Sequence, residues 1–158
     1  MSDIQPTQSR FPWPPILYLG SIAIGVGLSL LWPLPWISPP LSDILLAIGA
    51  LAIIATAGLY VSAIGSMRRA GTTIRPGESA RHLVTTGAFA LTRNPIYLAN
   101  TLLMIGIGLL AGSIWFLALA FIAATATKKL AIEREEKYLE SRFGKKYRDY
   151  AKKVRRWV

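Results

Sequence analysis

Residues 82–97 bring together side chains that could take part in chemistry, in a way that a plain connection between helices would not require. The segment contains threonines, a glycine, an arginine, an Asn-Pro step and two aromatic rings. Hydroxyl and amide groups can hydrogen-bond a ligand, and aromatic faces can hold a cation. Loops on a rigid scaffold are also where binding and catalytic residues concentrate. Residues 82–97 are therefore the first candidate for a functional site.

Three acids, Glu133, Glu135 and Glu136, form a second candidate. Both candidates also have a plain structural interpretation. Asn94 could cap a helix that begins at Pro95, because asparagine and proline are favoured at those two positions. Acids among lysines and arginines on a helix are usually solvated partners of basic residues one turn away. Neither pattern identifies a site by itself.

Three stretches without a charged side chain must supply the elements that position these residues: 11–42, 44–67 and 94–127. Each exceeds the roughly 20 residues that a helix needs to cross a bilayer. The chain has 158 residues, of which 53% are hydrophobic, and its apolar residues form blocks. This composition indicates one membrane domain. As one straight helix, the third stretch would be about 51 Å long, too long for one crossing and short for two full ones.

The distribution of the net charge of +10 decides how the third stretch crosses. Arginines dominate the charge of 67–95, and lysines and arginines dominate 128–158. Basic segments favour the cytoplasmic side, so the third stretch must turn back near residues 110–114. We therefore predict an all-α membrane protein with four transmembrane helices, the third and fourth forming a short hairpin, and a cytoplasmic C-terminal helical segment. Both termini and the site would be cytoplasmic, in a multi-pass protein of the cell (inner) membrane.

We expect the single domain, residues 1–158, to have five parts. They are a flexible lead-in (1–15), two helices (16–67), a cytoplasmic loop (68–97), a helical hairpin (97–130) and a cytoplasmic lid and tail (131–158). Only Arg10 is basic before the first apolar stretch, and no small-residue cleavage site follows it. We therefore expect this stretch to remain attached rather than to act as a signal peptide.

The composition excludes several classes of site. The chain contains no cysteine, which rules out disulfides, thiol catalysis and cysteine-based zinc or iron-sulfur sites. His82 is the single histidine, so we expect no metal site. A basic chain could bind nucleic acid, but basic charge beside membrane spans more often reflects topology and contact with anionic lipids. We expect membrane lipids rather than nucleic acid as partners.

Four motifs occur together in a fixed order: LVTTGAF at 83–89, RNPIY at 93–97, EEKYL at 135–139 and FGKKYRDY at 143–150. In this combination the chain resembles the superfamily of isoprenylcysteine carboxyl methyltransferases and phospholipid methyltransferases, over about residues 66–155. The resemblance implies an integral-membrane enzyme that transfers a methyl group from S-adenosylmethionine to a lipophilic substrate. It also implies a cytoplasmic cofactor pocket that is closed by the C-terminal segment, without a Rossmann domain.

The resemblance assigns roles residue by residue. The residues that it implies for cofactor binding are Arg81 or His82, the backbone of Leu83 and Val84, Phe89 where the family usually has tyrosine, Asn94, Pro95, Ile96, Tyr97, and Glu135, which would anchor a polar group of the cofactor. The residues that it implies for catalysis are Arg93, Tyr97 and Glu136. Methyl transfer from a sulfonium is an in-line displacement that needs no metal, so the enzyme must exclude water and align the two reactants.

Two departures from the family pattern concern the methyl acceptor. Asn94 replaces the more common histidine, and an amide cannot act as a titrating base. Ala131 stands where prenylcysteine enzymes have an arginine that is thought to engage the substrate carboxylate. An amine or another lipid-like nucleophile thereby becomes more credible. Phosphatidylethanolamine-type N-methylation is one alternative function, and a non-catalytic module whose basic tail binds anionic lipid or a protein is another.

Overall fold

The described part of the chain is built from helices. A computed structural model describes residues 13–72 and 82–158, and no strand occurs within these two ranges. The predicted all-α class is therefore confirmed for them. The helices are α1 (Trp13–Leu31), α2 (Leu41–Arg69), α3 (Pro95–Ala111), α4 (Ile114–Thr127), α5 (Glu133–Phe143) and α6 (Lys145–Lys153). A 3-10 turn, η1 (Gly87–Ala90), precedes α3, and a π-helical turn, η2 (Lys128–Ile132), joins α4 to α5.

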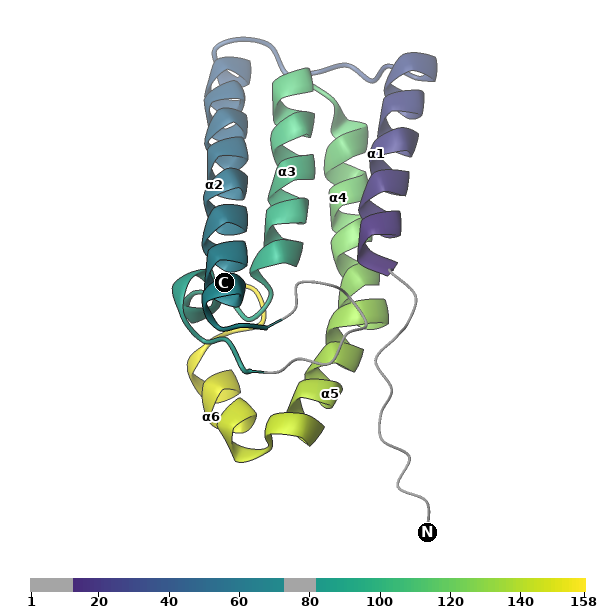
Figure 1. The fold of residues 1–158 in the computed structure, drawn as a ribbon. Coiled ribbons are helices and arrows are strands. Elements are labelled where there is room, and N and C mark those ends of the chain that lie inside the picture. The colour runs from purple at the N-terminus through teal and green to yellow at the C-terminus, as the bar shows by residue number, and fades with distance from the viewer. Residues whose placement is uncertain (1–12, 73–81) are drawn as a thin grey trace.

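The four longest apolar helices stand side by side in a row, in the order α2, α3, α4, α1 (Figure 1). Met104 of α3 and Phe116 of α4 are buried in the core of this row together with Tyr18 of α1. Small residues bring α2 and α3 close together, because a Cβ on Gly106 would lie 2.7 Å from the Ile53 side chain. Close backbone approach at small residues is typical of helix packing in membranes.

The hairpin between α3 and α4 turns where the sequence predicted it. Gly112 follows the last residue of α3 with a φ of +63°, the left-handed conformation that favours glycine. Trp36, from the connection between α1 and α2, packs against this turn, since a Cβ on Gly112 would lie 3.1 Å from its ring. Some boundaries differ from the prediction by two or three residues: α2 ends at Arg69 rather than at residue 67, and α1 begins at Trp13 rather than at residue 16. Its two prolines lie in the first turn, where a missing N–H costs no hydrogen bond.

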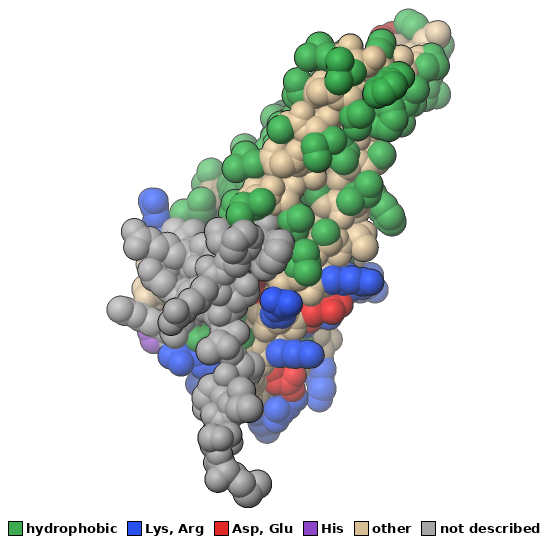
Figure 2. All heavy atoms as spheres, turned by 90° about the vertical axis from the view of Figure 1, so that its right-hand side faces the viewer, with side chains coloured by type: hydrophobic (Ala, Val, Ile, Leu, Met, Phe, Trp, Pro, Cys, Tyr) green, Lys and Arg blue, Asp and Glu red, His purple; other side chains and the backbone are tan. Residues whose placement is uncertain are grey.

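Within the described residues, three helical stretches are long and apolar enough to cross a membrane: Pro14–Leu31, Leu41–Arg69 and Ile114–Phe143, the last of which runs through α4, η2 and α5. The α3 helix is apolar but shorter, with 17 residues. On the face that Figure 2 shows, hydrophobic side chains are spread along the row, whereas lysines and arginines gather at the end that carries α5 and α6. The fold is therefore that of a membrane protein, and four crossings with a cytoplasmic C-terminal end remain a prediction.

Candidate functional site

The loop before α3 is fixed against the end of α2. Gly87 opens η1 with a φ of +63°, and the Ala88 backbone N–H donates to the Ser62 hydroxyl at 2.9 Å. A Cβ on Gly87 would overlap the Ser66 hydroxyl. Glycine is thus required at this position both for its backbone conformation and for the contact with α2.

The start of α3 corrects the capping interpretation of Asn94. As predicted, Asn94 stands at the N-cap and Pro95 follows it, but the Asn94 side chain makes no capping hydrogen bond. Its amide nitrogen instead donates to the backbone carbonyl of Arg156 at 2.9 Å, and the buried Thr92 hydroxyl donates to the same carbonyl at 3.1 Å. Long-range contact with the C-terminal segment therefore replaces the local cap.

One tyrosine and one glutamate from different helices form the centre of the site. The Tyr97 hydroxyl of α3 donates to Glu135 Oε2 of α5 at 3.0 Å. Burial raises the pKa of the Glu135 carboxyl, the bond from Tyr97 opposes this shift, and the neighbouring charge of Glu136 adds to it. An ionised carboxylate that is shielded from water is costly unless a cation or several donors approach it. The pair of Tyr97 and Glu135, here called the central pair, can therefore receive a cationic ligand.

The backbone of Tyr97 is held in place from α1. The Tyr18 hydroxyl lies 2.7 Å from the Thr101 hydroxyl and donates to the Tyr97 carbonyl at 3.3 Å. Thr101 donates to the same carbonyl at 3.0 Å. Helix α1 thus supports the first turn of α3, on which the central pair depends.

The turn η2 determines which side of α5 faces α3. A π-helical turn contains more residues than an α-helical turn and therefore changes the rotation of the helix that follows. Ile132 at the end of η2 is fully buried, whereas Arg134 and Lys137 of α5 are exposed. With this rotation Glu135 reaches Tyr97, while the basic side chains face away from the bundle.

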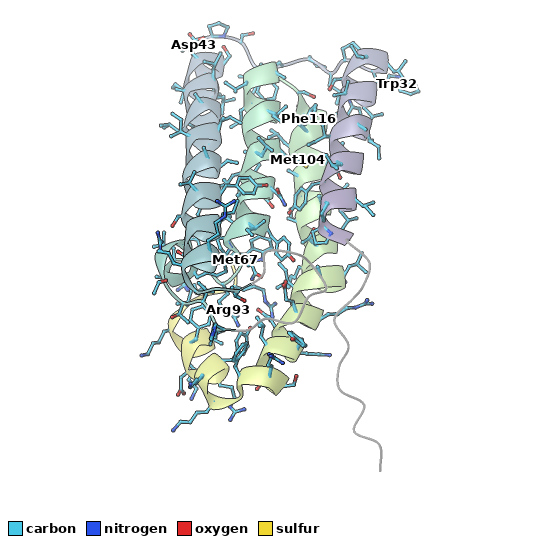
Figure 3. The ribbon with its side chains drawn as sticks, viewed as in Figure 1. Trp32, Asp43, Met67, Arg93, Met104 and Phe116 are labelled. Atoms are coloured by element: carbon cyan, nitrogen blue, oxygen red, sulfur yellow. The ribbon has the colours of Figure 1, made fainter. Side chains whose placement is uncertain are left out.

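Glu136 lies at the centre of a second cluster, which joins three segments. Arg156 Nε and Nη2 donate to its two oxygens at 3.0 and 2.5 Å, and Arg93 Nη1 lies 3.3 Å from Oε1. Arg93 also donates to the Tyr147 hydroxyl at 3.2 Å. We call Arg93, Glu136, Tyr147 and Arg156 the C-terminal clamp. Figure 3 shows its Arg93 below the helical row, between α3 and α6.

Further bonds hold the C-terminal segment against the loop. The Arg93 backbone N–H donates to the Arg155 carbonyl at 3.0 Å, and the Tyr150 hydroxyl donates to the Phe89 carbonyl at 2.6 Å. Burial raises the pKa of Tyr150 to about 12, so this hydroxyl keeps its proton at neutral pH. The bond to Glu136 raises the pKa of Arg156. The segment around α6 therefore covers the loop that contains the first candidate.

The structure brings most of the predicted site residues to this end of the fold. Arg93, Asn94, Pro95, Ile96 and Tyr97 form the start of α3, and Glu135 and Glu136 face it from α5. Of the predicted site residues in the loop, Leu83, Val84 and Phe89 are buried or partly buried, whereas His82 is exposed. Arg81 lies outside the described residues. The described ranges contain no group of three or more His, Asp or Glu side chains that could hold a metal ion.

Sequence reasoning missed two residues. Arg156 completes the clamp, but nothing in the sequence distinguishes it from the many other basic residues of the tail. Tyr138 follows Glu135 by three residues, a spacing that places the two side chains on neighbouring parts of one helix face. This spacing could have identified Tyr138 from the sequence as a neighbour of Glu135. The Tyr138 hydroxyl, like Arg93 Nε, is buried and has no hydrogen-bond partner in the part of the chain that the structure describes.

Comparisons with known proteins find relatives of the chain by sequence. The chain is 29% identical to the cobalt-zinc-cadmium resistance protein CzcN of Cupriavidus metallidurans, over 78% of this chain and 51% of CzcN. It is 31% identical to the nickel-cobalt-cadmium resistance protein NccN of Alcaligenes xylosoxydans xylosoxydans, over 90% of this chain and 60% of NccN. An uncharacterized protein of Haemophilus influenzae is 40% identical, over 40% of this chain and 100% of its own length.

The chain spans about half to three fifths of the length of the first two relatives. No solved structure matches it. A family model described as phospholipid methyltransferase matches residues 44–146, which include the loop before α3, the start of α3 and the central pair. This match extends over more than half of the chain, so the protein belongs to the phospholipid methyltransferase family.

Proposed function

We propose that the protein is an S-adenosylmethionine-dependent membrane methyltransferase of the isoprenylcysteine carboxyl methyltransferase type, acting on a lipophilic substrate. The observation that carries this proposal is the central pair, a shielded carboxylate held by a tyrosine within the part of the chain that matches the family. S-adenosylmethionine has an ammonium group, a sulfonium and several hydrogen-bond acceptors. A shielded carboxylate fits the cationic part of such a ligand, and α5 also carries Tyr138, whose buried hydroxyl has no hydrogen-bond partner among the described residues.

The residues of the chain would have separate tasks. Glu135 would bind the ammonium group, and the rings of Tyr97 and Phe89 are available to hold the sulfonium. Bound there, the cofactor supplies an electrophilic methyl group. The segment around α6, held by the C-terminal clamp, would keep water away from the reacting atoms. Arg93 and Glu136 are proposed to act in catalysis by holding that segment in place.

The proposal predicts a specific effect of neutralising Glu135. In purified full-length protein, Glu135→Gln should raise the Kd for S-adenosylmethionine at least about tenfold, because a charge-assisted bond is lost. Glu140→Gln is the matched control, since Glu140 lies on the same helix in an exposed ion pair, and its Kd should remain unchanged. Isothermal titration calorimetry in detergent measures both. If the wild-type protein showed no saturable binding, the proposed function would be wrong.

Two positions, Ala131 and Asn94, indicate which methyl acceptor the protein uses. Ala131 offers no charge for a carboxylate, and the Asn94 amide is occupied by the C-terminal segment. Phosphatidylethanolamine-type N-methylation is therefore the second candidate, favoured by the family description. A radiolabelled-methyl assay with total lipid extract and with a prenylcysteine analogue separates the two, because the label moves into phospholipid in one case and into the analogue in the other.

We also propose that α3 crosses the membrane as the fourth span and that α5 and α6 are cytoplasmic. The chain has no cysteine, so single cysteines can be placed at the exposed Ser38 and Ser141. Four crossings put these two positions on opposite sides, whereas three crossings put them on the same side. In intact cells we expect a membrane-impermeant maleimide to label Ser38→Cys but not Ser141→Cys until the cells are lysed. Labelling of both before lysis would contradict the proposed topology.

A further inference from the structure

The hydroxyl group of Tyr138 is unusual among the described residues. Its oxygen is buried and has no hydrogen-bond partner within 13–72 and 82–158, although Lys137 and Ser141 on the same helix are exposed. A buried hydroxyl without a partner destabilises the folded state relative to one that is satisfied. Phenylalanine would fill the same space without this cost. The contacts among the described residues therefore do not account for the hydroxyl.

The position of Tyr138 suggests what that partner is. Side chains three residues apart on a helix are neighbours, and each is tilted toward the N-terminal end of its helix. The ring of Tyr138 is therefore directed back along α5, toward the turn that carries Glu135. Glu135 in turn contacts Tyr97 at 3.0 Å. The unpartnered donor thus belongs to the same end of α5 as the central pair, and it takes no part in the C-terminal clamp.

We propose that the Tyr138 hydroxyl donates a hydrogen bond to an acceptor atom of the S-adenosylmethionine that the central pair holds. This inference rests on the proposed function and adds a residue to which the sequence motifs assign no role. The two side chains are complementary. Glu135 accepts hydrogen bonds from the cationic part of the ligand, and Tyr138 donates one to its carboxylate, ribose or adenine. Binding would satisfy a donor that the free protein leaves unpaired.

The test is Tyr138→Phe in the full-length protein in detergent, with two measurements. Calorimetry should show a Kd for S-adenosylmethionine that is about tenfold higher than in the wild type, because an acceptor on the ligand loses its donor. The melting temperature of the ligand-free protein should be unchanged or higher, because an unpartnered hydroxyl is removed. This opposite direction of the two effects separates a ligand-binding residue from a merely structural one.

Tyr60→Phe provides the matched control with the reverse expectation. The Tyr60 hydroxyl donates to the Asn100 side chain and so joins α2 to α3. Its removal should lower the melting temperature of the ligand-free protein and leave the Kd for S-adenosylmethionine unchanged.

Three outcomes would overturn the inference. An unchanged Kd in Tyr138→Phe would show that the hydroxyl does not contact the cofactor, while the proposed function would stand. A lower melting temperature of the ligand-free variant would show that the hydroxyl has a structural partner. Absence of saturable S-adenosylmethionine binding by the wild type would overturn the proposed function and the inference with it. This result can be told apart from a failure of the inference alone, because it is measured on the wild type and not on the variant.

Discussion

Glu136→Ala is expected to lower the free energy of unfolding by about 2–4 kcal/mol, because it leaves two arginines without their counter-charge. The Glu136 side chain is 16% exposed, and its partners Arg93 and Arg156 are 15% and 31% exposed, so water replaces the lost contacts only in part. The C-terminal segment should also detach from the loop. Denaturant unfolding in detergent measures the stability, and trypsin cleavage within 152–156 reports the detachment.

Glu140→Ala is the matched control for this experiment. Glu140 lies on the same helix and also pairs with an arginine, Arg148, at 3.7 Å, but both side chains are about half exposed. Exposed ion pairs contribute roughly 0–1 kcal/mol, so this variant should unfold almost as the wild type does and should resist trypsin equally well. Equal stability of the two variants would mean that the clamp does not hold the C-terminal segment.

Gly87→Ala should destabilise the protein by about 3 kcal/mol, for two separate reasons. A non-glycine residue in the left-handed conformation costs about 1–2 kcal/mol, and an added methyl group in a packed site costs about 1–3 kcal/mol. At Gly87 the φ is +63° and the new Cβ would overlap the Ser66 hydroxyl. Because η1 precedes the start of α3, binding of S-adenosylmethionine should weaken as well. Thermal unfolding and calorimetry in detergent measure the two effects.

Gly71→Ala isolates the backbone contribution. Gly71 has a φ of +61°, close to that of Gly87, but no atom of the described residues lies within 4 Å of a Cβ built there. This variant should lose only about 1 kcal/mol. Removing the hydroxyl with Ser66→Ala should then recover part of the loss in Gly87→Ala. If Gly71→Ala and Gly87→Ala were equally destabilised, contact with α2 would not position the loop.

The helices could be predicted from the sequence because the patterns that indicate them, blocks without charge and flanking basic segments, lie within short stretches of the chain. Blocks without charge identify the apolar helices, and the basic segments on either side of the third block required the hairpin that turns at Gly112. The motifs also led to Tyr97 and Glu135, which the structure brings to 3.0 Å. Helix signals and motif spacing are properties of short stretches, and they can be read without knowing the fold.

Other parts of the site depend on contacts that no short stretch contains. Asn94 has the sequence of a helix cap, yet its amide bonds the carbonyl of a residue 62 positions away. Arg156 is one of many basic residues in the tail, and only the packing of α6 selects it as the partner of Glu136. The π-helical turn was also unpredictable, because the lysines, leucine and alanine of Lys128–Ile132 favour an ordinary α-helix.

The π-helical turn η2 determines which mutations the protein can tolerate between α4 and α5. The side chains of Lys128–Ile132 other than the buried Ile132 are at least partly accessible, so most of them can be exchanged without disturbing the core. The number of residues matters in a different way. A π-helical turn holds about one residue more than an α-helical turn, so loss of one residue would leave an α-helical turn and nearly the same rotation of α5. Loss of two residues would rotate α5 by about 100°. Both glutamates would then leave their partners together. Deletion of two residues from this segment should therefore be far more harmful than deletion of one.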